Sequence, residues 1–359
     1  MSTDMYETNA WGKKSQETEF EKIKIQRNLA GDNDVSFDLQ YCGICHSDIH
    51  FANNELGNTS YPIVPGHELA GVVTAVGSNV TGIKVGDRVG VGCIVDSCNK
   101  CSQCEKGEEN FCEGGFTNAF NYPLVHGGLK TNTGYSFGGY CESMTVNKRY
   151  IVKIPDNYPM EAAGPIFCSG ITMYSPLAHW KALSGGMNVG IIGIGGLGQM
   201  GVRLAKAMGN KVTAISTSPN KKADAMAIGA DNFIVSKDAD SMASGENSLD
   251  LILNTVSAPH ELSHYLPLLR KDGTLVQLGL VTANHSVNQF PFLMKRINLS
   301  GSVIGGMPET QDCMDFCAKH GIIPATKLVK ADQIGEVYKS LETKNDQIVR
   351  YVLDIKASL

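Results

Sequence analysis

The feature that most constrains this chain is a glycine-rich motif near its middle, Gly193-x-Gly195-x-x-Gly198. A short apolar run over 188–192 precedes the motif and predicts a buried strand. Glycines at this spacing permit a tight turn, close approach of a pyrophosphate and packing of the next helix on the strand. Gly209 is predicted to be the C′ residue that ends the helix after the motif. Apolar residues at helical spacing lie between the motif and Gly209: Leu197, Met200, Leu204 and Met208. A glycine-rich turn without a ligand is the alternative, but the strand–turn–helix context favours dinucleotide binding.

Length and composition restrict the class of protein. The 359 residues suffice for two domains, and 42% hydrophobic and 19% charged residues are typical of a globular chain. A net charge of −5 and the lack of a basic run predict no nucleic-acid partner. No apolar stretch approaches the roughly 20 residues of a membrane span. Residues 1–14 lack the apolar region of a signal peptide, so we expect a cytoplasmic protein.

Eleven cysteines without a secretory signal point to metal binding or catalysis rather than disulfides. Four of them form the pattern C-x2-C-x2-C-x7-C, which places four thiolates within reach of one tetrahedral ion. A structural zinc contributes on the order of 10 kcal/mol, enough to order a loop with little apolar content. An iron–sulfur cluster is the competing interpretation. The four residues are Cys98, Cys101, Cys104 and Cys112.

The first part of the chain predicts β structure. Residues 19–52 look like strands and turns, residues 37–41 alternate in period two, and 65–73 and 85–89 continue the pattern of short strands. We therefore expect a small, partly open β-barrel.

From residue 155 onward the pattern changes to alternating strands and helices. Helices are expected over 221–228 and near 261–269, and 299–304 is expected to be the last strand. The further strands are expected over 212–216, 233–235, 250–256 and 274–279. This pattern predicts a doubly wound α/β domain with a parallel sheet. From about Met307 the chain alternates again and is expected to rejoin the first domain. The expected domains are thus 1–156 with 305–359, and 157–304.

A catalytic zinc needs three protein ligands and an open position. Cys45 and the adjacent His67 and Glu68 are candidates in the first domain, and Cys168 precedes the nucleotide-binding part. Each has another interpretation, because buried cysteines commonly act as small hydrophobic residues and a core histidine can be satisfied by hydrogen bonds alone. The residues by themselves leave these alternatives open.

The end of the second strand of the nucleotide domain predicts the cofactor. NAD-binding folds place an acidic residue there, whereas this chain has Ser216, Thr217 and Ser218, followed by Lys221 and Lys222. Hydroxyls can donate hydrogen bonds to a 2′-phosphate, and lysine supplies a positive charge. The lysines can also be ordinary surface residues at a helix start. The missing acid together with the lysines favours NADP(H).

Taken together, the motifs resemble the zinc-dependent medium-chain alcohol dehydrogenases, in particular the cinnamyl alcohol dehydrogenase branch. The resemblance runs from about residue 20 to the C-terminus. The matching segments are 43–48, 65–68, 86–92, the cysteine loop, 193–198, 215–222 and 304–307. It implies a barrel domain of the GroES-like type beside a Rossmann domain, and two zinc ions per chain.

The resemblance also implies roles for individual residues. Cys45, His67 and Cys168 would hold the catalytic zinc, with Glu68 as an occasional fourth ligand, and Asp48 would orient His67. Ser47 would pass a proton through the cofactor ribose, with His50 nearer to solvent, since histidine gains and loses protons near neutral pH. The expected cofactor-binding residues are Ser47, Thr172, Gly193, Ile194, Gly195, Gly196, Leu197, Gly198, Ser216, Thr217, Ser218, Lys221, Thr255, Gly279, Val303 and Ile304.

The chain departs from lignin-pathway members of the branch in two places. It lacks their tryptophan after the last loop cysteine, where Phe116 and Phe120 are possible substitutes, and it has Val303 where they have phenylalanine. We therefore expect an NADP(H)-linked aldehyde reductase and alcohol dehydrogenase of broad specificity, acting on small aldehydes and alcohols. The alternatives are an NAD-linked polyol or short-chain alcohol dehydrogenase and a non-catalytic NADPH-binding regulator.

Two further expectations concern assembly and the remaining thiols. A homodimer is expected through the edge strand over 299–304. The cysteines outside the two predicted metal sites are interpreted as ordinary buried or surface thiols: Cys42, Cys93, Cys141, Cys313 and Cys317.

Overall fold

The structure is a computed structural model that describes residues 4–281, 284–343 and 349–359. The chain divides into two compact units: unit 1 is Met1–Cys168 with Gly305–Leu359, and unit 2 is Ser169–Ile304. The division after Cys168 lies beyond the boundary expected at residue 156. The reason is that two 3-10 turns, η3 (Met160–Ala162) and η4 (Gly164–Phe167), pack on strands of unit 1.

Unit 2 is a doubly wound α/β domain, as the sequence predicts. Within the described residues, its sheet has six parallel strands in the order β12-β11-β10-β13-β14-β15. Numbered along the chain this order is 3-2-1-4-5-6, the arrangement of dinucleotide-binding folds. The strands are β10 (Asn188–Ile192), β11 (Lys211–Ser216), β12 (Asn232–Val235), β13 (Leu249–Asn254), β14 (Leu269–Gln277) and β15 (Asn298–Gly301). The helices are α3 (Ser169–His179), α4 (Gly196–Ala207), α5 (Lys222–Ala227), α6 (Ala239–Ser244) and α7 (Phe290–Lys295).

The glycine-rich turn joins β10 to α4. Gly193 has a φ of 86°, which favours glycine, and a Cβ on Gly198 would lie 1.8 Å from the Gly193 carbonyl oxygen. The turn can therefore close only with glycine at position 198. Gly209 follows α4 with a φ of 83°, which confirms its expected C′ role.

Two elements of unit 2 differ from the expectations. Residues 261–269 form two 3-10 turns, η7 (Leu262–His264) and η8 (Leu266–Leu268), instead of a helix, because Pro267 lacks the N–H that a continuous helix needs. The last strand ends at Gly301 rather than at residue 304. Ile304 has a φ of 39°, which no strand residue adopts.

Unit 1 contains the expected β-rich domain. Its main sheet has seven strands in the order β16-β17-β3-β4-β5-β9, with β8 also paired to β3. Along β3, Val35, Phe37 and Leu39 are buried while Asp38 is exposed, so the predicted period-two alternation is present. The strands are β1 (Met5–Gly12), β2 (Glu21–Asn28), β3 (Asp34–Gly43), β4 (Leu69–Val76), β5 (Arg88–Val91), β6 (Ile94–Asp96), β7 (Thr117–Asn118), β8 (Ser143–Asn147), β9 (Val152–Lys153), β16 (Thr326–Val329) and β17 (Arg350–Asp354).

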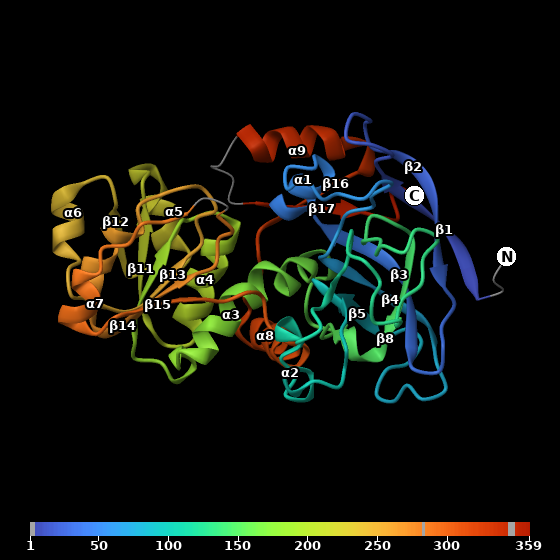
Figure 1. The fold of residues 1–359 in the computed structure, drawn as a ribbon, viewed down its shortest axis with the longest axis horizontal. Coiled ribbons are helices and arrows are strands. Elements are labelled where there is room, and N and C mark those ends of the chain that lie inside the picture. The colour runs from blue at the N-terminus through green and yellow to red at the C-terminus, as the bar shows by residue number, and fades with distance from the viewer. Residues whose placement is uncertain (1–3, 282–283, 344–348) are drawn as a thin grey trace. The chain divides into compact units, whose positions relative to one another are not determined.

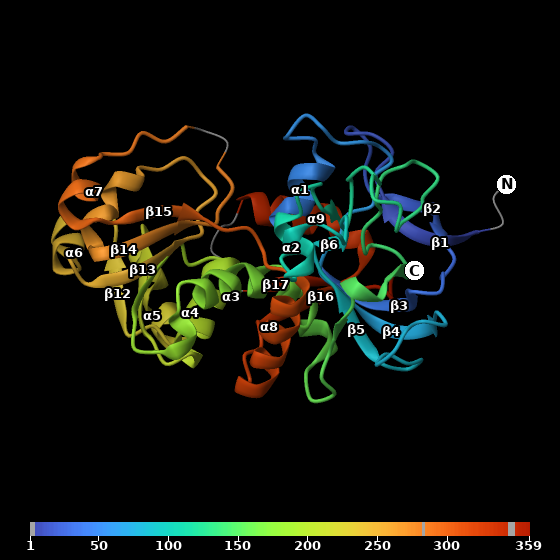
Figure 2. The ribbon, with the colours of Figure 1, turned by 60° about the horizontal axis from the view of Figure 1, so that its bottom comes forward.

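The helices of unit 1 are α1 (His46–Ala52), α2 (Ser102–Glu105), α8 (Met307–His320) and α9 (Ile334–Thr343). The sequence interpretation of 19–52 as strands and turns missed α1, which begins where Asp48 accepts the N–H of Cys45 at 2.8 Å. α1 and α9 lie side by side in both views (Figure 1 and Figure 2), joined by a hydrogen bond from Asn53 to Glu342. Within the described residues, no helix has the length and apolar character that a bilayer crossing needs.

Candidate active site and cofactor-binding site

Four side chains of unit 1 converge where the sequence predicts a catalytic metal. The ligand atoms of Cys45, His67, Glu68 and Cys168 all lie within 4.8 Å of one another. The two sulfur atoms are 3.9 Å apart, and His67 Nε2 is 3.3 Å from Cys168 Sγ. Cys45 precedes α1, His67 and Glu68 precede β4, and Cys168 follows η4. Long-range folding therefore brings together residues more than one hundred positions apart.

Asp48 holds this cluster in place and is itself completely buried. One of its carboxylate oxygens accepts the N–H of Cys45, and the other accepts the N–H of Gly66 at 3.0 Å. The second oxygen also lies 3.2 Å from His67 Nδ1. Because Nδ1 donates to the carboxylate, Nε2 faces the thiols with a free lone pair, the arrangement found in metal-bound histidines.

Glu68 is a buried carboxylate with an incomplete set of partners. Arg350 Nη2 lies 2.9 Å from Oε1, but neither Glu68 oxygen accepts a hydrogen bond within the described residues. A Cβ on Gly43 would lie 1.9 Å from Oε2, so the glycine makes room for this carboxylate. The sequence interpretation missed Arg350 as a neighbour of the cluster, because a single arginine near the C-terminus carries no local signal.

Burial and the close contacts shift the proton affinities of the cluster. The hydrogen bond from Cys168 holds the pKa of the Cys45 thiol well below its usual value, while that of Cys168 is raised. Burial raises the pKa of Glu68 to about 7, although Arg350 opposes the shift. Burial alone would lower the pKa of His67, but the charge of Asp48 and other contacts raise it overall.

Two more side chains contact the cluster. The Cys93 thiol hydrogen-bonds that of Cys168, so Cys93 belongs to the surroundings of the site rather than to the ordinary thiols.

The buried Phe120 ring stacks on His67, with 5.7 Å between the ring centroids, and Phe51 of α1 meets Phe120 edge-on at 5.4 Å. Phe116 stacks on Tyr122, which packs on Phe51. An aromatic cluster thus extends from the imidazole of His67.

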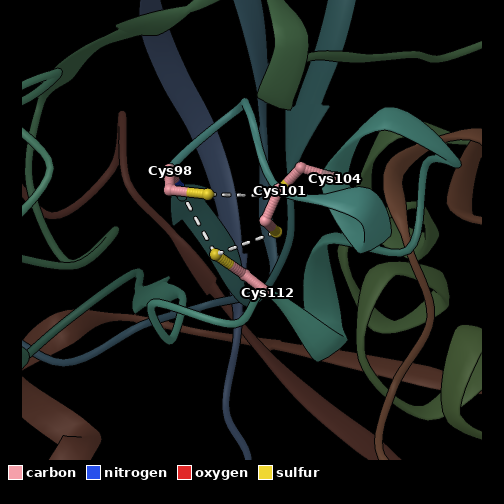
Figure 3. A group of neighbouring side chains, drawn as sticks. All are labelled: Cys98, Cys101, Cys104 and Cys112. Carbon is pink, nitrogen blue, oxygen red and sulfur yellow. Dashed lines mark hydrogen bonds between the residues drawn. The ribbon is translucent and has the colours of Figure 1, made fainter.

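The predicted structural metal site is also assembled. Figure 3 shows the four cysteine sulfurs of the loop pointing toward one another. The Sγ atoms of Cys98 and Cys104 are 3.9 Å apart, and those of Cys101 and Cys112 are 4.0 Å apart. These distances exclude disulfides, whose sulfurs are about 2.05 Å apart. Backbone N–H groups lower the pKa of Cys101 to about 6, whereas burial raises that of Cys104 to about 12.

Both clusters fit zinc by their donor chemistry and spacing. Zn–S bonds of about 2.3 Å at tetrahedral angles separate two sulfurs by roughly 3.8 Å, and a sulfur and a histidine nitrogen by roughly 3.5 Å. The sulfur pairs at 3.9 and 4.0 Å and the His67–Cys168 distance of 3.3 Å agree with these values. Glu68 Oε2, which accepts no hydrogen bond within the described residues, is a further reason to expect a cation at the first cluster.

The glycine-rich turn and Ser216 lie at the carboxyl ends of their strands in unit 2. A Cβ added to Gly195 would have no other atom within 4 Å, so the turn leaves open space in front of the N-terminus of α4. Ser216 ends β11 and its Oγ accepts the N–H of Ser218 at 3.2 Å. Lys221 Nζ donates to the carbonyl of Ile194 at 3.2 Å and so lies over the glycine-rich turn.

The remaining predicted residues occupy several elements. Ser47 and His50 are on α1, and Thr172 is on α3. Thr255 follows β13 and donates to the carbonyls of Ile192 and Gly193. Gly279 follows β14, and Val303 and Ile304 follow β15.

Comparisons with known proteins give the family. Residues 31–156 match the family described as alcohol dehydrogenase GroES-like domain, and residues 196–319 match that described as zinc-binding dehydrogenase. NADP-dependent alcohol dehydrogenase C 1 of Mycolicibacterium smegmatis (strain ATCC 700084 / mc(2)155) is 47% identical over 334 residues, 93% of each chain. Aldehyde reductase YahK of Escherichia coli (strain K12) is 45% identical over 349 residues, 96% of this chain and 97% of its own.

The chain belongs to the zinc-dependent medium-chain alcohol dehydrogenases. Its place in the cinnamyl alcohol dehydrogenase-like branch is supported by a solved cinnamyl alcohol dehydrogenase from Sorghum bicolor, which is 36% identical, covers 99% of both chains and has a TM-score of 0.92. The resemblance predicted from the motifs is confirmed, and so is the expected fold class. The enzyme is an alcohol oxidoreductase, and the cluster of Cys45, His67, Glu68 and Cys168 is its candidate active site.

Proposed function

We propose that the enzyme reduces aldehydes with NADPH, and oxidises the corresponding alcohols with NADP+, with broad substrate specificity. The observation that carries this proposal is the convergence of Cys45, His67 and Cys168 around one point, with Asp48 fixing the imidazole. When bound, zinc would supply a Lewis acid for the carbonyl oxygen and NADPH a hydride for the carbonyl carbon. Relatives described as an NADP-dependent alcohol dehydrogenase and an aldehyde reductase support this proposal.

The chain's own residues would hold the metal and supply the proton. Cys45, His67 and Cys168 are the proposed ligands, and Glu68 is an additional carboxylate within reach. Ser47 Oγ lies 3.9 Å from Cys45 Sγ, which makes its hydroxyl the proposed donor to the nascent alcohol. His50 follows one helical turn later, is 39% exposed and pairs with Glu55 at 2.6 Å, so it can exchange a proton with solvent. His50→Gln is expected to slow turnover about tenfold or more and to change its pH profile.

NADP(H) rather than NAD(H) is proposed because the end of β11 offers hydroxyls and a cation where an acid would repel a 2′-phosphate. Ser216, Thr217, Ser218 and Lys221 are the proposed contacts. The first test is the initial rate of NADPH and NADH oxidation with cinnamaldehyde, benzaldehyde and hexanal. Turnover with NADPH alone supports the proposal, and a preference for NADH would favour the NAD-linked alternative. No turnover by protein with two zinc ions per chain would refute the aldehyde reductase.

Within this broad specificity, binding of aromatic aldehydes is proposed from the aromatic cluster of Phe51, Phe116, Phe120 and Tyr122 beside His67. Ring stacking is worth about 0.5–1.5 kcal/mol. Phe116→Ala is therefore expected to raise the KM for cinnamaldehyde about threefold to tenfold while leaving hexanal less affected. Equal effects on both aldehydes would contradict a contact with the substrate ring.

Two zinc ions per chain, a homodimer and a cytoplasmic location complete the proposal. The presence of two assembled donor clusters supports the zinc count. All eleven cysteines are free thiols, as expected in a reducing compartment. On α7 and after β15, large apolar side chains are exposed, including Leu293 at 81% and Val303 at 45%. Because β15 is at the edge of the sheet, we propose that two copies pair there.

Light scattering coupled to size exclusion tests the dimer. Leu299→Lys on β15 is expected to give monomers, whereas Leu183→Lys is the matched control on a different exposed leucine, at 44% exposure against 40% for Leu299. A monomeric wild-type protein at micromolar concentration would refute this part of the proposal.

A further inference from the structure

A polar network without an assigned role lies at the carboxyl ends of β13 and β14. Its centre is Asn254, the last residue of β13, which is fully buried. The side-chain amide of Asn254 donates to Gln277 Oε1 and to His260 Nε2, both at 2.7 Å. Its Oδ1 accepts the N–H of Val256 at 3.3 Å, and its backbone carbonyl accepts those of Leu278 and Gly279. Every polar atom of this side chain is thus used.

The backbone fixes the direction of each hydrogen bond. Gln277 Nε2 faces the carbonyl of Gly279 at 2.7 Å, so this atom must be the amide nitrogen and Oε1 must face Asn254. Asn254 in turn presents its nitrogen to Gln277 and its oxygen to the Val256 N–H. His260 Nε2 therefore has to accept, and Nδ1 donates to the carbonyl of Ala258 at 2.7 Å. The network is complete only with a neutral imidazole.

Protonation of His260 would place a second N–H against the Asn254 amide. Rotating Asn254 by 180° would only move the conflict, because its nitrogen would then face the Val256 N–H and its oxygen would face Gln277 Oε1. Rotating Gln277 as well would set its oxygen against the Gly279 carbonyl. Each alternative leaves an unmatched polar pair in this partly buried network around Asn254, which is costly.

The network ties together the two loops that the cofactor is expected to contact. A Cβ on Gly279 would lie 2.2 Å from the Val256 carbonyl oxygen, so the loops after β13 and β14 touch at their backbones. Thr255, between Asn254 and Val256, is also bound to the glycine-rich turn at Gly193. The half of the sheet formed by β12, β11 and β10 carries that turn and the hydroxyl of Ser216 at the end of β11. The second half, with β13 and β14, is therefore left for the nicotinamide nucleotide.

We propose that His260 is a positioning residue for the nicotinamide half of the cofactor, acting through Asn254 and Gln277, and that it makes the affinity for NADPH depend on its being neutral. The inference rests on the proposed function, because it takes NADP(H) as the cofactor of unit 2. It predicts that protonation of His260 weakens the nicotinamide half of the site, separately from any effect of pH on the phosphates that the adenosine half binds.

Other titratable groups near His260 have to be separated from it. The ring of His285 lies 5.4 Å away, the ring of Tyr265 lies 6.1 Å away, and Glu261 follows in the chain. His260→Gln leaves all three in place and supplies an amide oxygen as an acceptor that cannot be protonated in this range. A pH effect that persists in this variant would belong to the neighbours or to the phosphates of the ligands.

The test measures binding without substrate, by fluorescence titration of NADPH and by displacement with adenosine 2′,5′-bisphosphate. The bisphosphate lacks the nicotinamide but carries the same 2′-phosphate. The ratio of the two dissociation constants, compared between the wild type and His260→Gln at each pH, therefore reports the effect of His260 on the nicotinamide half. Measurements run from about pH 5.5 to about pH 8.5, where histidine changes charge. The variants are His260→Gln, His260→Ala and, as matched control, His264→Gln, because His264 contacts the carbonyl of Ser236 outside the network.

At the acid end, the wild type and His264→Gln are expected to lose about tenfold more NADPH affinity, relative to the bisphosphate, than His260→Gln loses. His260→Gln is expected to show only the pH change that the phosphates of the two ligands cause, and His260→Ala is expected to bind NADPH more weakly relative to the bisphosphate at every pH. Ratios that change with pH equally in the wild type and His260→Gln would overturn the inference while leaving the cofactor proposal intact. If the wild type binds neither ligand, the NADP(H) proposal fails, and the inference falls with it.

Discussion

The substitution Asp48→Asn tests the central feature of the candidate active site with little change in shape. The carboxylate accepts three N–H groups, those of Cys45, Gly66 and the His67 ring. An amide has one acceptor and one donor atom, so in either orientation its NH2 faces at least one of these N–H groups. The loss of a charge-assisted hydrogen bond and the burial of an unmatched donor together cost roughly 2–4 kcal/mol.

This cost falls on the zinc-bound state, because the imidazole is then no longer held with Nε2 toward the thiols. Loss of such a partner lowers metal affinity about tenfold to one hundredfold, which corresponds to about 1.4–2.8 kcal/mol and agrees with the hydrogen-bond figure. The assay is zinc content after equilibration with a chelator of intermediate affinity. The wild type is expected to retain two ions per chain and Asp48→Asn one.

The matched control is Asp87→Asn, because the Asp87 carboxylate lies in a turn, where it accepts the N–H of Lys84 at 3.0 Å; this variant should retain both ions. If Asp48→Asn holds its second zinc ion as tightly as the wild type, the carboxylate does not orient the ligand and the argument is wrong.

Three further predictions concern the cysteine loop, the glycine-rich turn and acid stability. Cys112→Ser removes one of four proposed ligands from a zinc site whose binding free energy is on the order of 10 kcal/mol. The variant should lose one zinc ion and become sensitive to proteolysis between residues 98 and 112. Unchanged digestion would show that no metal orders the loop. Gly198→Ala forces a Cβ to within 1.8 Å of the Gly193 oxygen and should weaken NADPH binding more than about tenfold in a fluorescence titration, and an unaltered dissociation constant would contradict the role of the turn. Burial opposes ionisation of Asp231, but Lys206 and the Val212 N–H outweigh it and lower its pKa. The ionised carboxylate contributes about 1 kcal/mol to the free energy of unfolding above its unfolded-state pKa near 4, and this contribution is lost as pH falls through the lower folded-state pKa. In thermal unfolding, Asp231→Asn should therefore have a lower Tm than the wild type at neutral pH but not in acid. A difference in Tm that grows in acid would refute this sign.

Several parts of this protein could be predicted because the residues involved lie close together in the chain. The cysteines from 98 to 112 share one loop, so their spacing alone limits how far apart the sulfurs can be. The strand, glycine turn and helix around Gly195 are likewise local, and the hydroxyls at Ser216 lie at the end of a strand that periodicity identifies. A local pattern also failed where one residue altered the backbone, as Pro267 did for the expected helix over 261–269.

Other features were decided only by the tertiary structure. Spacing left Cys45, His67 and Cys168 ambiguous, and their convergence depends on how β3, β4 and η4 pack. Neither the ion pair between Glu68 and Arg350 nor the hydrogen bonds of Asn254 had any signal in sequence. The physical reason is that a buried polar group is satisfied by whatever the fold brings within about 3 Å of it, and for partners far apart in the chain that is fixed by strand pairing and packing rather than by residue spacing.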